Sequence, residues 1–244
     1  MKVLILAAGT SSRLKPLTKL VPKTLLPLSD DQTMIDYILN NCYQNNLKDF
    51  YFVTGHGHEQ VKKHIANFSR EKKDVSCKLI YNTEYGSKGN IYSFYLAQKA
   101  ISDDYILIHS DVIFHPEILR DVLNYPEKNA MAVDDVKQLG VEEMKVTLNE
   151  KKQIQKIHKA LKPEEAHGEH IGVFKISKEV KEKLLAAIEE TLAENDQVYY
   201  EDSIQKLINQ NIPFYPVSTK GRPCMEIDTH EDLAKAKEII KLCQ

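Results

Sequence analysis

The chain has 244 residues, of which 42% are hydrophobic and 28% are charged, and its formal net charge is -2. These values are typical of a globular protein with a sizeable core, and they disfavour a broad basic face that grips nucleic acid. No apolar run approaches the roughly 20 residues that span a bilayer. The four cysteines lack the paired spacing of zinc or disulfide sites. We therefore expect a single domain over residues 1–244, located in the cytoplasm, with neither nucleic acid nor membrane as a partner.

Short apolar runs rich in β-branched residues alternate with helical patterns along the chain. Strands are predicted at residues 3–7, 50–54, 76–81, 105–109, 131–133, 145–148, 154–158, 171–176 and 213–217. Helices are predicted at residues 33–44, 58–68, 90–100, 116–123, 178–192, 201–209 and 230–242. The alternation in the first half predicts an α/β fold, a mainly parallel sheet with helices on both faces. The segment 144–158 is different and predicts a β-hairpin beside the sheet. An apolar stripe on the last helix predicts that it docks back on the domain.

A loop of small residues follows the first strand, and ligands in open α/β sheets bind near the carboxyl ends of strands. Small side chains at residues 7–12 let the backbone N–H groups converge on phosphate oxygens. Arg13 adds a planar donor fork, and Lys23 adds a second positive charge. A polar turn followed by a solvated basic loop is the structural alternative, and composition alone favours it. A P-loop is excluded, because no Gly-Lys-Ser/Thr follows Gly9.

Residues 6–28, LAAGTSSRLKPLTKLVPKTLLPL, resemble the signature of the nucleotidyltransferases that make activated sugars, inositol and choline. That signature is L-A-A-G-x-G-S-R-L-x-P-L-T followed by P-K-x-L-L, and Ser11 replaces its second glycine. The resemblance implies a Rossmann-like nucleotidyltransferase fold with a mainly parallel mixed sheet. It implies that Arg13 and Lys23 are catalytic and bind the reacting phosphates. The nucleotide-binding residues that it implies in this loop are Leu6, Ala7, Ala8, Gly9, Thr10 and Ser12.

Residues 82–97 resemble a second motif, N-x-x-Y-x-x-x-N-N-x-Y-S-L-Y-L-A, of the small bacterial CTP-dependent cytidylyltransferases of the choline-phosphate type. Gly89 replaces the first asparagine of the pair, and Asn90 retains the second. The N-terminus of the helix that starts here offers free N–H groups. The resemblance implies that Asn82, Asn90 and Ser93 bind the nucleotide. Ordinary helix capping by Asn90 is the structural alternative.

Two acidic positions resemble the magnesium ligands of the same family. Asp111 follows a buried strand, where a carboxylate is costly without a partner such as a metal ion. Residues 226–232 match the group's E-I-D-[ST]-x-x-D, in which Glu226 and Asp228 alternate along a strand end and point to one face. The resemblance implies that Asp111 and Asp228 bind Mg²⁺. A solvated acidic turn explains residues 226–232 on their own, and His109 is not assigned as a ligand.

The resemblance continues through the rest of the chain and implies an acceptor site. Aromatic rings with carboxylates suit a cationic head group, although the chain has no tryptophan. The histidines of residues 56–64 and the pair His167 and His170 match no zinc motif, so we interpret them as loop or surface residues. The acceptor-binding residues implied are Lys145, Tyr200, Glu201, Asp202 and Glu226.

The expected function is transfer of CMP from CTP to a small phosphorylated or phosphonate acceptor, such as choline phosphate, with release of diphosphate. The alternatives are a sugar-1-phosphate nucleotidyltransferase that uses UTP or dTTP, and an inactive nucleotide-binding module. The expected partners are CTP and the acceptor, and a homodimer is compatible with the sequence. Charge distribution supports a phosphate site, because residues 1–29 contain five basic and no acidic residues.

Overall fold

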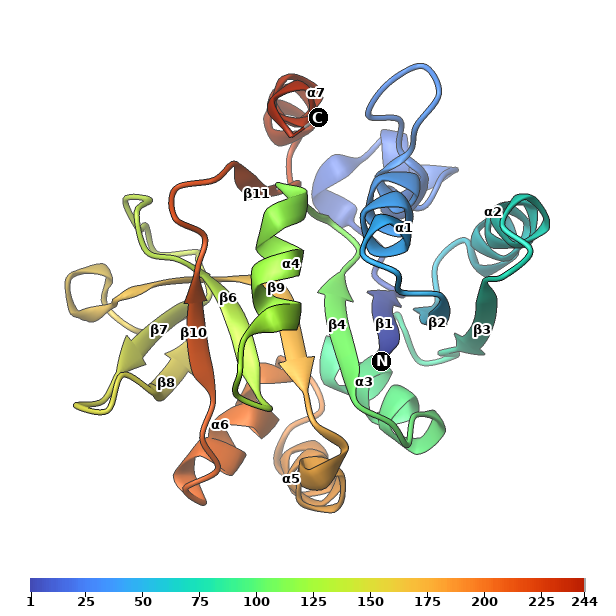
Figure 1. Ribbon diagram of the computed structural model, residues 1–244. Helices are drawn as coiled ribbons and strands as arrows, with labels where there is room; N and C mark the ends of the chain where they lie inside the picture. The colour runs from blue at the N-terminus through green and yellow to red at the C-terminus, as the bar shows by residue number, and fades with distance from the viewer. Residues whose placement is uncertain (244) are drawn as a thin grey trace.

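The computed structural model describes residues 1–243 and has a nine-stranded sheet at its centre (Figure 1). The strands along the main path of the sheet follow the order β10-β6-β9-β4-β1-β2-β3. The strands are β1 (Lys2–Ala7), β2 (Asp49–Thr54), β3 (Ser76–Tyr81), β4 (Tyr105–His109), β5 (Val112–Phe114), β6 (Ala130–Asp134), β7 (Lys145–Leu148), β8 (Ile154–His158), β9 (Gly168–Ile176), β10 (Tyr215–Ser218) and β11 (Cys224–Glu226). The helices are α1 (Met34–Gln44), α2 (His58–Glu71), α3 (Asn90–Ala100), α4 (Pro116–Asn124), α5 (Lys181–Glu194), α6 (Glu201–Asn209) and α7 (His230–Leu242).

The first half of the chain forms the parallel part of the sheet. β1 pairs in parallel with β2 and β4, and β2 pairs in parallel with β3. β9 then enters antiparallel between β4 and β6. Because β1 and β4 are covered on both faces, they are almost continuously apolar. Because β1 and β4 run parallel, their carboxyl ends meet at one edge of the sheet.

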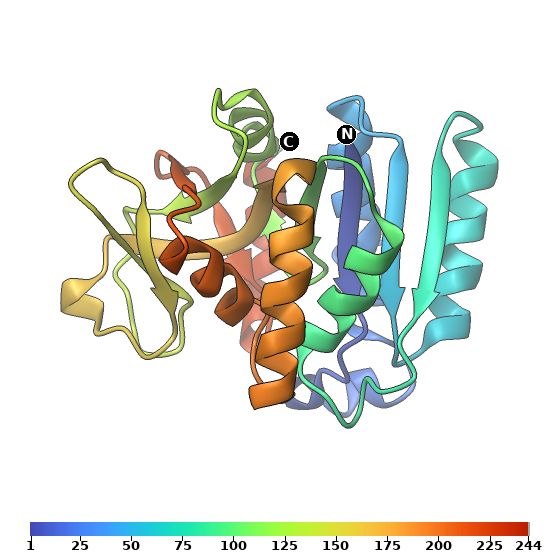
Figure 2. The same ribbon diagram turned by 90° about the horizontal axis from the view of Figure 1, so that it is seen from below.

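Helices cover both faces of the sheet (Figures 1 and 2). Side chains of α1, α2 and α4 share one core with β1 and β2, whereas side chains of α3, α5 and α6 share a second core that reaches the β7–β8 hairpin. A third cluster joins α7 to α1 and to the loop after β1. It includes Leu233, Ala236 and Ile240 from α7, so the predicted docking of the last helix is confirmed.

The predicted α/β fold with a hairpin insertion is confirmed, and the differences are local. β7 and β8 pair antiparallel at the predicted residues. The predicted helix at 178–192 begins three residues late, because residues 178–180 form a separate 3₁₀ turn that Ser177 caps. The pair β5 and β11 was not predicted, since each strand has only three residues. No helix within residues 1–243 is both long and apolar enough to cross a membrane.

Candidate active site

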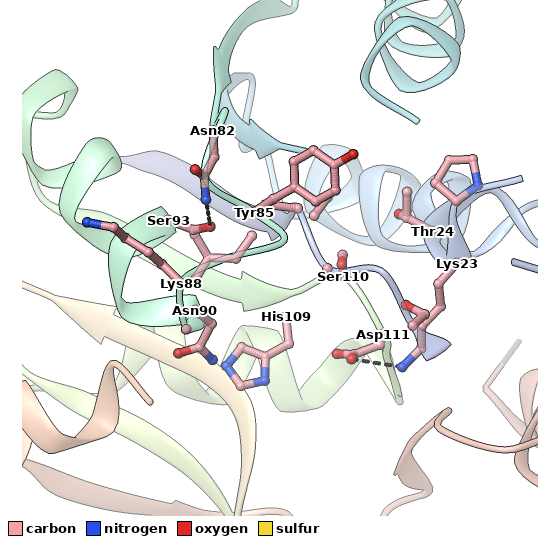
Figure 3. A pocket seen from close by; sticks show the side chains of 17 residues that line it. Lys23, Thr24, Asn82, Tyr85, Lys88, Asn90, Ser93, His109, Ser110 and Asp111 are labelled. Carbon is pink, nitrogen blue, oxygen red and sulfur yellow. Dashed lines mark hydrogen bonds and ion pairs between the residues drawn. The ribbon is translucent and has the colours of Figure 1, made fainter. Parts of the chain in front are cut away.

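A pocket lies at the carboxyl ends of β1 and β4, next to the start of α3 (Figure 3). This is the edge at which open α/β sheets bind ligands. A shallower hollow continues from it past Lys23 toward Asp228. The predicted site residues that line the pocket are Leu6, Ala7, Ala8, Gly9, Lys23, Asn82, Asn90, Ser93 and Asp111. The predicted site residues that line the hollow are Thr10, Ser12, Arg13, Lys23, Asp111 and Asp228.

The loop after β1 is held in place by close backbone packing. A Cβ on Gly55 would lie 2.6 Å from the carbonyl oxygen of Ala8, so glycine is required there. A Cβ on Gly9 would meet no described atom within 4 Å, which leaves open space above this residue for a ligand. Ser11 has a φ of 49°, in the left-handed region that favours glycine. This explains why the family signature has glycine at the position of Ser11.

Amide and hydroxyl groups form the end of the pocket beside α3. The side-chain amide of Asn82 donates to Ser93 Oγ at 2.9 Å, and Asn82 Oδ1 accepts from the N–H of Glu84. Asn90 Oδ1 accepts from the N–H of Tyr200 at 2.9 Å, so its amide nitrogen remains to donate. These bonds fix the side chains before any ligand binds. The Asn82 and Ser93 side chains point toward each other across this end of the pocket (Figure 3).

Gly89 departs from the family motif for a steric reason. A Cβ at this position would lie 2.4 Å from the carbonyl oxygen of Val198. The N–H of Gly89 also donates to the carbonyl oxygen of Asp196 at 2.7 Å. The chain between α5 and α6 therefore approaches the start of α3 too closely for asparagine at residue 89.

Opposite charges pair at the other end of the pocket. Lys23 Nζ lies 2.9 Å from Asp111 Oδ2 and 2.9 Å from Asp228 Oδ1. Arg13 lies 2.8 Å from the other oxygen of Asp228. Burial alone would lower the pKa of Lys23, but the two carboxylates outweigh it and raise the pKa. Burial opposes ionisation of Asp111, yet Lys23 and His109 hold its pKa below the usual range. Lys23 is thus a fixed cation at the strand ends.

The donor set of this cluster fits a hard divalent cation. Asp111 follows β4 and Asp228 follows β11, and both carboxylates converge on the single ammonium of Lys23. Two carboxylates that reach one cationic centre suit Mg²⁺, which commonly takes one or two protein carboxylates together with phosphate oxygens. Asp111 and Asp228 are therefore the residues that would hold it.

A buried group of ionisable side chains adjoins the pocket at His109, which the sequence interpretation left unassigned. His109 Nε2 and Tyr200 Oη are 2.7 Å apart, and His109 Nδ1 is 3.7 Å from Glu226. His109 Nε2 is also 3.9 Å from Glu201. Burial disfavours the charged imidazole, but Glu226, Glu201 and Asp111 raise the pKa of His109 to about 9. Burial raises the pKa of Glu201 to about 7.

The structure corrects the interpretation of His170 as a loop or surface residue. His170 lies in β9 and is 1% exposed. Its Nε2 is 3.4 Å from Tyr200 Oη, and burial, aided by nearby His109, lowers its pKa to about 3. His167, three residues earlier, is exposed as expected.

Two predicted acceptor residues lie away from the pocket. Lys145 is fully buried, and its ammonium donates to the carbonyl oxygens of Val141 and Glu143 at 2.9 and 3.0 Å. This placement argues against the predicted phosphate contact, because the donors are directed at backbone. Asp202 lies 3.9 Å from His158 on β8 and not among the residues that line the pocket. Tyr200, Glu201 and Glu226 do not line the pocket either, but they contact His109, which does.

The pocket also contains residues that sequence reasoning missed. Tyr85, Lys88 and Thr24 line it beside the predicted residues. Lys88 Nζ lies 4.6 Å from the centroid of the Tyr92 ring and 3.8 Å from Asp196. Tyr85 and Lys88 belong to the turn before α3, where the motif pattern fixes only some positions. The sequence could have indicated them only through their position between Asn82 and Asn90.

A sheet whose strand ends carry a small-residue loop, two cations and two carboxylates is typical of α/β proteins that bind phosphorylated ligands. The model of the nucleotidyl transferase family matches residues 2–241. The chain therefore belongs to the nucleotidyl transferase family, and it is a nucleotidyltransferase. The resemblance stated on residues 6–28 is thereby confirmed.

Relatives and a solved structure are similar to this chain over nearly its whole length. Choline-phosphate cytidylyltransferase of Streptococcus pneumoniae is 24% identical over 242 residues, which cover 99% of this chain and 99% of that protein. CTP:phosphoglutamine cytidylyltransferase of Campylobacter jejuni is 25% identical and covers 96% of this chain and 98% of that protein. The structure of the inositol-1-phosphate CTP transferase from T. maritima has a TM-score of 0.83 at 23% identity, covering 99% of this chain and 95% of that one. That structural likeness shows the fold.

Proposed function

We propose that this nucleotidyltransferase transfers CMP from CTP to a small phosphorylated or phosphonate acceptor and releases diphosphate. The observation that carries the proposal is one pocket with an amide end at Asn82, Asn90 and Ser93 and a cationic end at Lys23. The amide end suits the donors and acceptors of a cytosine or ribose edge. The cationic end suits the triphosphate. The names of two full-length relatives, both cytidylyltransferases, support CTP as the nucleotide.

The reaction needs positioning and charge stabilisation more than covalent chemistry by the protein. An oxygen of the acceptor phosphate attacks the α-phosphorus of CTP in line, and the bond to the β,γ-diphosphate breaks as diphosphate leaves with the electron pair. The loop of residues 6–12 offers N–H groups to the phosphates. Arg13 and Lys23 stabilise the negative charge that develops. Asp111 and Asp228 would hold Mg²⁺, which supplies further positive charge to the phosphate oxygens.

The acceptor site extends from the cationic end toward His109. His109 lines the pocket, and Tyr200, Glu201 and Glu226 contact this histidine from behind, so they would position it beside the acceptor. The relatives act on different phosphorylated compounds, so we assign only the shared chemistry, a phosphate or phosphonate oxygen on a small polar molecule. The protein would work in the cytoplasm, where CTP is available.

Diphosphate release tests the proposal directly. Each of the four common NTPs is supplied with choline phosphate, 2-aminoethylphosphonate, inositol phosphate, glycerol phosphate or a phosphorylated amino acid derivative. We expect release with CTP, dependent on Mg²⁺ and on at least one acceptor. Release with UTP or dTTP and a sugar 1-phosphate, but not with CTP, would replace the nucleotide assignment. No release with any NTP would favour a nucleotide-binding module without activity.

A further inference from the structure

Three side chains with metal-ligating atoms meet beside the floor of the pocket. His109 ends β4, His170 lies in β9, and Glu201 begins α6. Their ligating atoms all lie within 4.8 Å of one another. His170 and Glu201 are 1% and 3% exposed, whereas His109 lines the pocket. Figure 3 shows the His109 ring among the side chains that line the pocket.

We propose that His109, His170 and Glu201 form a binding site for one divalent transition-metal ion of the zinc type. This site is separate from the carboxylates of Asp111 and Asp228. Imidazole nitrogens with a carboxylate are a ligand set for Zn²⁺ or Fe²⁺, whereas Mg²⁺ prefers oxygen ligands throughout. The two clusters therefore select different ions by chemistry.

An unpartnered buried oxygen is independent support for this site. Within residues 1–243, Glu201 Oε2 is buried and has no hydrogen-bond partner. Buried carboxylate oxygens normally have a partner, because an unpaired one costs free energy. A cation held beside His109 and His170 would supply that partner. Burial lowers the pKa of His170 to about 3, so its imidazole is neutral and can ligate a metal, whereas His109, whose pKa is raised to about 9, must release a proton when the ion binds.

The two imidazoles already converge on one point. Nε2 of His109 and Nε2 of His170 lie 2.7 and 3.4 Å from the same atom, the hydroxyl oxygen of Tyr200. Zinc–nitrogen bonds are about 2.1 Å, so two ligands on one ion lie roughly 3.4 Å apart. The ligating atoms lie up to 4.8 Å apart, so they must move together by as much as about 1.4 Å on binding. The Tyr200 hydroxyl either moves aside or joins the ligands.

The backbone is shaped to hold the His109 ring in this position. Gly172, in β9, has a φ of +74°, and a Cβ there would lie 2.5 Å from Cγ of His109. The ring also packs edge-on against Tyr200, with centroids 5.5 Å apart. A bound ion would therefore join β4, β9 and α6 beside the pocket, and it would stabilise the fold by binding only the folded state.

Direct metal binding tests the proposal and needs no nucleotide, so its outcome is independent of the diphosphate assay. The purified full chain is stripped with a chelator and titrated with Zn²⁺ in excess Mg²⁺, and the bound metal is measured after gel filtration. Co²⁺ serves as the spectroscopic probe. We expect one Zn²⁺ per chain, a higher melting temperature, and the intense visible absorption of low-coordinate Co²⁺. Absence of saturable binding would overturn the proposal.

Substitutions locate the ion. Glu201→Gln, which keeps the side-chain shape, and His170→Gln should each weaken Zn²⁺ binding at least tenfold. His167→Gln, on an exposed histidine close by, is the matched control and should leave binding unchanged. The double variant Asp111→Asn, Asp228→Asn should retain the zinc. Binding that survives Glu201→Gln and His170→Gln, or that disappears only in the double variant, would overturn the assignment.

Discussion

At one end of the pocket, the ammonium of Lys23 lies 2.9 Å from each of two carboxylates, Asp111 and Asp228. Beside the floor of the same pocket, in the part that we call the His109 end, His109 and His170 share the hydroxyl of Tyr200, while Glu201 keeps one oxygen without a partner in the described chain. The charge of Lys23 is therefore matched by carboxylates, whereas the His109 end has a buried carboxylate oxygen, on Glu201, that lacks a partner in the described chain.

The comparison separates two kinds of function. At the Lys23 end, an incoming triphosphate and a metal ion can exchange for the existing ion pairs, because the Asp111 and Asp228 side chains are still about one-third exposed. At the His109 end, the groups are enclosed by β4, β9 and α6, and any change in them also changes packing. Substitutions at the first end should mainly alter turnover, whereas those at the second should mainly alter stability and metal binding.

Lys23→Ala should have the largest effect on turnover. Removing the fixed cation from the phosphates should lower kcat/KM about 10³-fold, which corresponds to roughly 4 kcal/mol of transition-state stabilisation. The protein should remain folded, because the Asp111 and Asp228 side chains are about one-third exposed and water can solvate them once the ammonium is removed. Diphosphate release and thermal unfolding check both expectations. Lys19→Ala removes a charge from the same segment at an exposed position and is the control. Near-normal activity of Lys23→Ala would refute its role.

Asp228→Asn should have the next largest effect. The amide cannot replace a carboxylate as a Mg²⁺ ligand, so we expect turnover to fall about 10²-fold, or roughly 3 kcal/mol. The Mg²⁺ concentration that gives half-maximal activity should rise at the same time. A titration of activity with Mg²⁺ measures both effects. Asp30→Asn, in an exposed turn, should behave as the unmodified chain. An unchanged Mg²⁺ requirement would contradict the assigned ligand.

The sequence predicted the Lys23 end better than the His109 end for a physical reason. Arg13 and Lys23 lie in one continuous loop, and Asp111 and Asp228 each follow a strand, so short local patterns indicate them. His170 reaches His109 only because β9 enters the sheet antiparallel beside β4, a pairing that no local periodicity encodes. The long strands and the hairpin have enough residues for periodicity to show, whereas β5 and β11 do not.

Lys145 illustrates the same limit for a single residue. Its position at the start of β7 was predicted, but the direction of its ammonium was not. That direction depends on the carbonyl groups of Val141 and Glu143 in the preceding loop, which cluster around the ammonium. A lysine that satisfies backbone carbonyls and one that reaches a phosphate have the same local sequence pattern.

Gly172→Ala tests the His109 end through packing. The added Cβ would lie 2.5 Å from the His109 ring, and the φ of +74° disfavours any L side chain. We expect the free energy of unfolding to fall by about 2 kcal/mol. Chemical denaturation measures this change. Gly86→Ala has open space and no positive φ, so its stability should be unchanged. Equal stability of both variants would show that the ring is not held by residue 172.

Arg13→Lys should have the smallest effect and separates two explanations for this arginine. Its side chain is 61% exposed, and its ion pair with Asp228 is of the solvent-exposed kind that contributes little to stability. The contribution of this ion pair to stability therefore does not explain an arginine at residue 13. Binding of a phosphate does explain it, because the planar guanidinium binds two oxygens at once. Lysine keeps the charge and loses the fork, so kcat/KM for CTP should fall roughly tenfold, with thermal unfolding unchanged. Unchanged kcat/KM would mean that charge alone suffices at this position. A fall in stability would mean that the contact with Asp228 matters more than the exposed geometry implies.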